Sequence, residues 1–437
     1  MKSKTFQIIF VIGAVVFALA MPIRLAAQGH RQQNSSLPRY LVTDLGPTQS
    51  FAEGINNRGL VAGTARLADG VTQHAFFWQK GIQTDLGTLG GPNSSAFFKP
   101  SEHGQVAGNA ETSTPDPLGE DFCAYGTHLV CTGFVWQNGA MVPLATLGGN
   151  NSWATGGVNN RGQVGGTAED STLDPTCSNA AYQARPVIWE KGIVRGLPPL
   201  PGDPDGSVSG INDRGQAVGV TTDCVASPTI FHAVLWRAGT ITDLGGFGGS
   251  LNNSANGINS RGQVVGVSDL PGDTSFHAFL WENGAMTDLG TLYGLPSSWA
   301  FGINDEGQIV GMDCDANFDC GAFLWQDGTM TDLNLLLPNN TPWNLIVATN
   351  INARGEIVAT AENNGFHTVL LTPCDERHAQ DEGCEEQDLA ATPPPARERF
   401  RTTLPGRDRQ LLWQRLGLRY HIPIWERQPN GSKAWPR

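Results

Sequence analysis

Short apolar stretches separated by glycine-rich turns run along most of this chain. In the stretch 277–281, alternate side chains lie on opposite faces of an extended strand, and apolar residues occupy both faces. The pair Asn283-Gly284 follows, which is a strong signal for a two-residue β-hairpin turn. Another short strand follows at 286–290, and no segment before residue 405 has helical periodicity of useful length. The pattern predicts antiparallel strands throughout the body of the chain.

The phrase Ile-Asn-x-x-Gly marks a repeat, because its Gly recurs every 45 to 58 residues. Asn at the first position and Gly at the last suit a type I turn between two strands. A variable loop then leads to the apolar third strand, and the hairpin turn leads to a fourth. The phrase occurs, once with Val in place of Ile, at 55–59, 158–162, 211–215, 258–262, 303–307 and 351–355, and a degenerate copy fills 100–104.

Seven four-stranded meanders predict an all-β fold, a seven-bladed β-propeller over residues 40–373. Each sheet needs cover on both faces, and closure into a ring supplies it. The seventh copy ends after residue 373 without its fourth strand, and a matching strand precedes the first copy at 41–46. We therefore expect the N-terminal strand to complete the last blade. Six tryptophans at one repeat position are expected in the core: Trp78, Trp136, Trp189, Trp236, Trp281 and Trp325.

These phrases resemble the HAF-repeat family of bacterial extracellular repeat proteins. The resemblance rests on His-Ala-Phe-Leu-Trp at 277–281, on the ten residues at 257–266, and on Thr-Asp-Leu-Gly at 242–245 and 287–290. It spans about residues 40–373 and implies export and a repeat fold, but it brings no catalytic residues with it. The second copy departs most from the pattern, so its blade is expected to be irregular.

Residues 1–27 predict a signal peptide, and 28–39 a linker. Early lysines precede an apolar stretch at 8–20, and small residues offer cleavage after Ala20 or Ala27. The stretch is shorter than the about 20 residues of a membrane span, and an uncleaved signal anchor remains the alternative. No later segment predicts a transmembrane span. The protein is thus expected to be secreted, either extracellular or periplasmic.

Eight cysteines in an exported chain predict disulfides, and none of them has metal-ligand spacing. Two pairs each share one loop insertion, two single cysteines lie in equivalent loops of adjacent blades, and two follow the last repeat. The expected bonds are Cys123–Cys131, Cys314–Cys320, Cys177–Cys224 and Cys374–Cys384.

Charge divides the chain into an acidic body and a basic end. Residues 38–373 carry 31 Asp and Glu against 13 Lys and Arg, which disfavours nucleic-acid binding. An acidic and proline-rich linker at 374–396 leads to a tail at 397–437 with ten Lys and Arg against three Asp and Glu. Leu412, Trp413 and Leu416 lie in a segment that suits a short amphipathic helix. The tail could dock on the propeller, contact a membrane surface or stay disordered.

The two faces of the predicted ring differ. The turns between strands 1 and 2 and between strands 3 and 4 are short and uniform, and we call the face that they form the turn face. The other face, the loop-rich face, carries the connections between blades and all the long insertions, at 109–131, 167–184, 220–230 and 312–321. Since function tends to lie in variable loops on a rigid scaffold, this is the candidate binding face.

One insertion suggests a calcium site. Asp313, Asp315, Asn317 and Asp319 alternate along the loop and offer several oxygen ligands, as calcium requires. Phe318 stands where an EF-hand loop needs Gly, and no later bidentate Glu follows. The alternative is a solvated acidic loop closed by a small disulfide.

Repeated polar residues are expected to be structural, because catalysis needs no repetition around a ring. This applies to His74, His232, His277 and His367, and to Asp44, Asp85, Asp243, Asp288 and Asp332. Catalysis would need unrepeated loop residues, for which the candidates are Glu120, Asp121, Tyr125, Arg185, Asp203 and Asp205. No spacing among them identifies a reaction, so we assign no catalytic residue and no cofactor-binding residue, and calcium is the single cofactor considered.

The sequence thus predicts a secreted, non-catalytic propeller that binds a glycan or a protein through its loop-rich face. A purely structural role at the cell surface is a second reading. The alternative is an enzyme, a hydrolase or lyase that acts on extracellular polysaccharide, since paired carboxylates are set by space rather than by sequence.

Overall fold

The computed structural model describes residues 38–46, 50–177, 181–224, 228–338 and 341–375, and a few tail positions, namely 377, 378, 384, 410, 412–414, 416, 417, 426, 427, 433 and 434. The chain divides into two compact units, Met1–Leu37 and Pro38–Arg437. All the described residues belong to the second unit. The expected signal peptide and most of the linker at 28–39 lie outside the described residues, as does most of the segment after residue 378.

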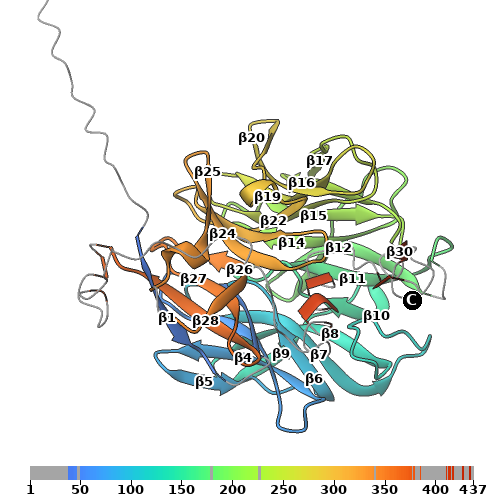
Figure 1. Ribbon diagram of the computed structural model, residues 1–437. Coiled ribbons are helices and arrows are strands. Elements are labelled where there is room, and N and C mark those ends of the chain that lie inside the picture. The colour runs from blue at the N-terminus through green and yellow to red at the C-terminus, as the bar shows by residue number, and fades with distance from the viewer. Residues whose placement is uncertain are drawn as a thin grey trace, which may run out of the picture. The chain divides into compact units, whose positions relative to one another are not determined.

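Seven four-stranded antiparallel sheets form the blades of a β-propeller, which confirms the predicted fold (Figure 1). Blades 1 to 3 are β2 (Ser50–Ile55), β3 (Val61–Arg66), β4 (Gln73–Gln79) and β5 (Ile82–Asp85); β6 (Gly90–Ala96), β7 (Val106–Pro115), β8 (Leu129–Gln137) and β9 (Ala140–Pro143); and β10 (Gly148–Trp153), β11 (Val164–Leu173), β12 (Tyr182–Glu190) and β13 (Ile193–Gly196). Blades 4 and 5 are β14 (Asp205–Ile211), β15 (Ala217–Thr222), β16 (Phe231–Arg237) and β17 (Thr240–Asp243); and β18 (Asn253–Ile258), β19 (Val264–Asp269), β20 (Phe276–Glu282) and β21 (Ala285–Asp288). Blade 6 is β22 (Ser297–Ile303), β23 (Ile309–Cys314), β24 (Cys320–Gln326) and β25 (Thr329–Asp332), and blade 7 is β26 (Asn344–Ile351), β27 (Ile357–Glu362), β28 (Phe366–Pro373) and β1 (Tyr40–Asp44).

The N-terminal strand closes the ring as predicted. β1 pairs antiparallel with β28, with Tyr40 opposite Pro373 and Asp44 opposite Val369, and the two strands lie side by side in Figure 1. His367 on β28 also pairs with Asp44 on β1, with 3.1 Å between Nδ1 and Oδ2. Blade 7 is therefore built from both ends of the repeat array, and its hydrogen bonds join those ends.

The asparagine of the repeat phrase links each blade to the next one on the turn face. Its Oδ1 accepts backbone N–H groups two and four residues later, for example those of Arg354 and Glu356 at Asn352. The turn ends at a glycine with positive φ, such as Gly355 at +78°. The side-chain Nδ2 donates to a backbone carbonyl of the next blade at 2.9 to 3.0 Å, in the pairs Asn56 to Ser101, Asn159 to Asn212, Asn212 to Asn259, Asn259 to Asn304, Asn304 to Asn352 and Asn352 to Asn56.

These bonds explain why the phrase recurs, and they also show what the degenerate copy lacks. Ser101 replaces the asparagine in blade 2 and has no amide group to donate to blade 3. The second contact of the repeat is kept there, because the N–H of Glu102 donates to Oδ1 of Asn160 at 2.7 Å, as the N–H of Asn160 does to Oδ1 of Asp213 at 2.8 Å. The predicted irregularity of the second copy thus lies at one interblade link.

The first strands of the blades lie around the centre of the ring and are bonded to each other. In four blades this strand carries one extra, bulged residue, namely Glu53, Ser209, Asn256 and Phe301, and in blade 7 it carries two, Ile346 and Thr349. Nδ2 of Asn256 donates to the carbonyl of Ala300 in the next blade at 2.9 Å, and Oγ1 of Thr349 donates to that of Ala52 at 3.0 Å. Bulges therefore supply partners for strand edges that would otherwise be open.

Each of the six repeated tryptophans packs in a different apolar cluster, which confirms their place in the core. The clusters contain Trp136, Trp281, Trp325, Trp189, Trp236 and Trp78. Trp189 and Trp236 are the most buried, and each donates its indole N–H to a backbone carbonyl at 2.7 Å, that of Ala145 and that of Pro198 respectively. A tryptophan can be buried in this way because its one polar atom finds a partner.

Short elements complete the described part of the second unit. Two 3-10 helices lie in interblade connections, η1 (Leu292–Gly294) and η2 (Leu333–Leu336). In the tail, residues 410, 412–414, 416 and 417 are helical, and β29 (Glu426–Arg427) pairs with β30 (Lys433–Ala434). Within the described residues no helix has the length and apolar character needed to cross a membrane.

Candidate functional site

Disulfides hold the insertions of the loop-rich face. Cys123–Cys131 closes the insertion of blade 2, Cys177–Cys224 joins blade 3 to blade 4, and Cys314–Cys320 joins the end of β23 to the start of β24. The fourth bond, Cys374–Cys384, follows β28. The four pairs are those expected from the sequence. They indicate an oxidising, non-cytoplasmic compartment.

The second strand of several blades carries at its sixth residue a buried carboxylate that holds the chain entering the blade. Oε2 of Glu111 accepts the backbone N–H of Asn93 at 3.1 Å and its side-chain amide at 2.8 Å. Oε2 of Glu169 accepts the N–H of Asn151 at 2.7 Å, and Asp269 makes the equivalent contact in blade 5. These residues were not predicted from the sequence, although an acidic residue at the same position of the second strand in several repeats was a usable signal.

Glu120 is an unrepeated residue of the blade 2 insertion that meets one of these carboxylates. Its carboxyl group hydrogen-bonds that of Glu169, and among the described residues no donor outside this pair reaches Oε2 of Glu120 or Oε1 of Glu169. Burial and the negative charge of Glu169 raise the pKa of Glu120 to about 9, and burial also raises the pKa of Glu169. At neutral pH one shared proton joins the two groups.

Two further carboxylates surround this pair. Oδ1 of Asp116 accepts the N–H of Glu120 at 3.1 Å, and Oδ2 accepts the amide of Asn151 at 2.9 Å. The charges of Asp116 and Asp205 contribute further to the raised pKa of Glu120. Asp116, Glu120, Glu169 and Asp205, which we call the acidic cluster, come from blades 2, 3 and 4. The structure therefore brings together two of the six unrepeated candidates, Glu120 and Asp205.

Three other unrepeated candidates make contacts that stabilise loops. Tyr125 donates its hydroxyl to Oγ of Ser95 at 2.9 Å, and Asp121 accepts the N–H of Tyr125 at 3.0 Å. Nε of Arg185 pairs with Oδ2 of Asp170 on the neighbouring strand at 3.0 Å. These bonds give each of the three side chains a partner within the loops and strands of its own face.

The repeated histidines pair with aspartates, in agreement with the structural role that their repetition predicted. Asp243 and Asp332 likewise accept the N–H group two residues along the chain. Asp203, the sixth unrepeated candidate, takes the place of the repeated aspartate beside one histidine. The Nδ1 to carboxylate pairs are His74–Asp85, His277–Asp288 and His232–Asp203 at 2.8 Å, and His367–Asp44 at 3.1 Å.

The loop at 313–319 directs its carboxylates to different partners. Oδ2 of the buried Asp313 accepts the N–H of Leu292 at 2.7 Å, and burial raises the pKa of Asp313 to about 8. Oδ1 of Asp315 accepts the N–H groups of Asn317 and Asp319 at 2.7 and 3.0 Å. In this conformation two of the four proposed ligands are thus hydrogen-bonded elsewhere. The calcium hypothesis stays a prediction.

One close group of three metal-type ligands occurs among the described residues, and it consists of Cys177, Asp205 and Cys224, with ligand atoms within 4.8 Å of each other. Both sulfur atoms belong to one disulfide, so neither is a thiolate. We therefore assign no metal to this group.

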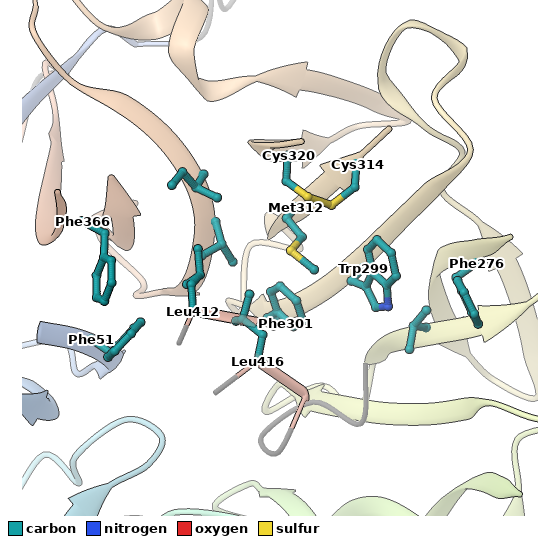
Figure 2. Close-up of a cluster of buried hydrophobic side chains, with 13 residues drawn as sticks. Phe51, Phe276, Trp299, Phe301, Met312, Cys314, Cys320, Phe366, Leu412 and Leu416 are labelled. Atoms are coloured by element: carbon teal, nitrogen blue, oxygen red, sulfur yellow. A yellow bond between two sulfur atoms is a disulfide. The ribbon is translucent and has the colours of Figure 1, made fainter. Parts of the chain in front are cut away.

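The described helical residues of the tail lie on the loop-rich face. Leu412 and Leu416 are buried, with 2% and 5% of their surface exposed, in a cluster that includes Phe301 (Figure 2). The ring of Trp413 meets that of Phe318 edge to face, with centroids 5.1 Å apart. Of the three hypotheses for the tail, docking on the propeller is the one seen for these residues.

No protein-family model and no curated protein matches this chain. Solved structures with a similar fold include an acylaminoacyl peptidase of Pyrococcus horikoshii, with 10% identity, 76% of this chain and 53% of the peptidase covered, and a TM-score of 0.43. A gluconolactonase of Xanthomonas campestris has 10% identity, coverage of 78% and 96%, and a TM-score of 0.37. The Aleuria aurantia lectin, a six-bladed β-propeller, has 10% identity, coverage of 65% and 96%, and a TM-score of 0.33. This chain spans about half the length of the peptidase, and similarities this low do not bear on activity.

Proposed function

We propose that this protein is a secreted, non-catalytic binding protein whose loop-rich face takes up an extracellular glycan or protein. The observation that carries the proposal is the contrast between the two faces. The turn face repeats one set of bonds, whereas the loop-rich face carries unrepeated insertions that disulfides hold in place. Rigid, individual loops on a closed scaffold are preorganised for binding, because less conformational entropy is lost when a ligand arrives.

The acidic cluster gives this face a local chemistry. Its carboxylates can accept hydrogen bonds from the hydroxyl groups of a sugar, or pair with basic side chains of a protein. Ligands that bring hydroxyl or cationic donors are therefore favoured over anionic ones. The resemblance to the HAF-repeat family is consistent with export and stays a prediction.

The test is a glycan-array screen of the full mature chain, with the variant Glu120→Gln beside it. The control is Glu306→Gln, which makes the same chemical change at an exposed residue of the turn face. We expect glycan binding that Glu120→Gln weakens at least about tenfold, the equivalent of one hydrogen bond, because an NH2 group that cannot accept replaces a carboxyl oxygen, and that the control leaves unchanged. An equal loss of glycan affinity in both variants would contradict binding at the loop-rich face. If no glycan on the array binds, a glycan ligand is contradicted and a protein ligand is favoured.

The second candidate function is a hydrolase or lyase that acts on polysaccharide. The raised pKa of Glu120 favours it, since a carboxyl group that stays protonated near neutral pH is a typical general acid. The geometry of the pair disfavours it, because Glu120 and Glu169 are in direct hydrogen-bond contact whereas glycosidase carboxyl groups stand roughly 5 to 9.5 Å apart. Release of reducing ends from polysaccharide by the wild type, abolished in Glu120→Gln, would favour the enzyme.

A further inference from the structure

An apolar patch lies on the loop-rich face beneath the tail helix. We use the name apolar patch for a set of buried side chains from blades 1, 5, 6 and 7. They are Phe51, Val267, Phe276, Trp299, Phe301, Met312, Ile346, Val347 and Phe366, with the disulfide Cys314–Cys320. The rings of Phe51 and Phe366 pack at a tilt with centroids 4.7 Å apart, and those of Phe276 and Trp299 stack at 5.7 Å. Large rings from four blades thus converge on one surface.

The helical residues present one apolar side to this patch. Leu412 and Leu416 are one helical turn apart and are buried, whereas Gln410 and Gln414 are exposed. Figure 2 shows Leu412 and Leu416 beside Phe301 within the cluster. The contact therefore has the form of an amphipathic helix in an apolar groove.

Phe301 connects this patch to the centre of the ring. It is the bulged residue of β22, and it also lines a hollow formed by the ends of the first strands of blades 4 to 7 and by residues that follow the first strands of blades 2 and 3. The hollow has a mixed lining that includes Lys99 and Asn350. Phe301 is thus shared between the surface that the tail helix covers and the hollow at the centre of the ring.

We propose that the apolar patch is a helix-binding site that the chain's own helical residues 410, 412–414, 416 and 417 occupy in cis, and that this helix leaves the patch when the loop-rich face takes up its ligand. The inference rests on the proposed binding function and adds its regulation. The tail acts as an autoinhibitory plug over one half of the binding face. Blades 2 to 4, with the acidic cluster and two of the disulfides, form the other half.

Two features of the chain make the helix separable from the ring. The seven blades are complete without it, because β1 supplies the last strand. Thirty-six residues, 374–409, stand between the end of β28 and Gln410, which is length enough for the helix to leave and return. The docked state is favoured by the apolar contacts and by attraction between the basic tail and the acidic body, which salt screens.

The test uses the full mature chain and a labelled synthetic peptide of residues 405–420. The variant Leu412→Asp with Leu416→Asp places two charges in the patch and should release the helix. Its matched control, Gln410→Asp with Gln414→Asp, places the same two charges on the exposed side of the same helix. We expect the released variant to bind the peptide at least tenfold more tightly than the wild type or the control does, and to enhance the fluorescence of an apolar dye several-fold.

Hydrogen exchange on the wild type gives a second measurement that needs no variant. Amides of 410–417 should exchange at least a hundredfold faster than those of β22, because the helix opens while the ring stays closed. Equal protection of both segments, or a folded released variant that fails to bind the peptide, would overturn the proposal. Peptide binding does not depend on a glycan or protein ligand, so a failed ligand screen and a failed plug give different results.

Discussion

The turn face and the loop-rich face of this propeller are built from the same strands by different means. On the turn face, one asparagine side chain per blade caps its own turn and donates to the next blade, and six of the seven blades repeat this arrangement. On the loop-rich face, buried carboxylates hold the entering chain, and insertions, disulfides and a tail helix differ from blade to blade.

The difference separates what holds the ring together from what distinguishes its blades. A repeated hydrogen bond specifies the spacing between blades at every interface, so the turn face has little freedom to vary. The loop-rich face does not set the spacing between blades, so its residues can differ from blade to blade, as they do in the acidic cluster. If this reading is correct, substitutions on the turn face should change stability alone.

Both faces depend on closure of the ring, so removing β1 should have the largest effect. Deletion of residues 37–47 removes Tyr40 and Leu45, which are 1% and 3% exposed, together with a whole ladder of hydrogen bonds. Two such side chains alone contribute roughly 3 to 6 kcal/mol, and we expect the melting temperature to fall by about 10 °C or more, with aggregation. Deletion of residues 28–36 is the control. An unchanged thermal melt would contradict closure by β1.

The disulfides of the loop-rich face should differ in their effect according to the chain that they enclose. Cys177–Cys224 spans 47 residues and Cys123–Cys131 spans eight. The loop-entropy relation predicts a loss of about 4 kcal/mol for the serine pair at 177 and 224, against about 2.5 kcal/mol at 123 and 131. Chemical denaturation of both variants measures this. An equal or reversed ranking would show that local contacts rather than loop length decide the stability of this face.

The turn face can be tested in both directions. Asn352→Ala removes the side-chain donor to the carbonyl of Asn56 and the acceptor for the N–H groups of Arg354 and Glu356. We expect a loss of about 2 to 4 kcal/mol in the free energy of unfolding. Ser101→Asn restores the missing donor to blade 3 and should add about 1 kcal/mol. Urea unfolding measures both. Two results together would contradict this role of the repeated bond. They are an unchanged free energy of unfolding in Ser101→Asn, and a loss of less than about 1 kcal/mol in Asn352→Ala.

The acidic cluster predicts that stability depends on pH with a definite sign. The pKa of Glu120 is raised to about 9 by burial and by Glu169, so the folded protein holds a proton that the unfolded chain loses near pH 4.5. Stability should therefore decrease as the pH rises from about 5 to 9 and then level off. In Glu120→Gln the amide N–H can donate to Glu169 at any pH and takes up no proton. The melting temperature of this variant should therefore vary less over this range. Glu306→Gln is the control and should follow the wild type, and a variant as pH-dependent as the wild type would argue against the shared proton.

The turn face could be predicted from the sequence almost completely, and the loop-rich face only in part. The spacing, turn type and core positions of a repeat can be identified by comparing its copies. The blades, the closing strand and the core tryptophans could therefore be predicted from the sequence. The structural role of the repeated histidines followed from repetition as well, whereas their pairing with aspartates was not predicted. What repetition cannot report is which unrepeated residues meet in space.

The acidic cluster and the tail illustrate this limit. Glu120 and Asp205 were two candidates among six, and their meeting at Glu169 depends on how three blades are placed side by side. The tail segment carried an amphipathic pattern, but the sequence did not show whether its leucines would contact a membrane, pack on the propeller or stay exposed to solvent. The receiving surface is assembled from four blades that are distant in sequence.

The smallest expected effect concerns calcium at the loop 313–319. Asp313 is bonded to Leu292, and its pKa of about 8, raised by burial, keeps it mostly uncharged at pH 7. Asp315 caps its own turn, so calcium would have to displace bonds already made. We expect calorimetric titration of metal-stripped protein to give little heat, with any affinity weaker than about 10⁻³ M, the lower end for extracellular modules. The same trace is expected for Asp315→Ala. A saturable heat that this variant abolishes would instead establish the calcium site, and it would make this loop a third device, beside disulfides and carboxylates, by which the loop-rich face is held.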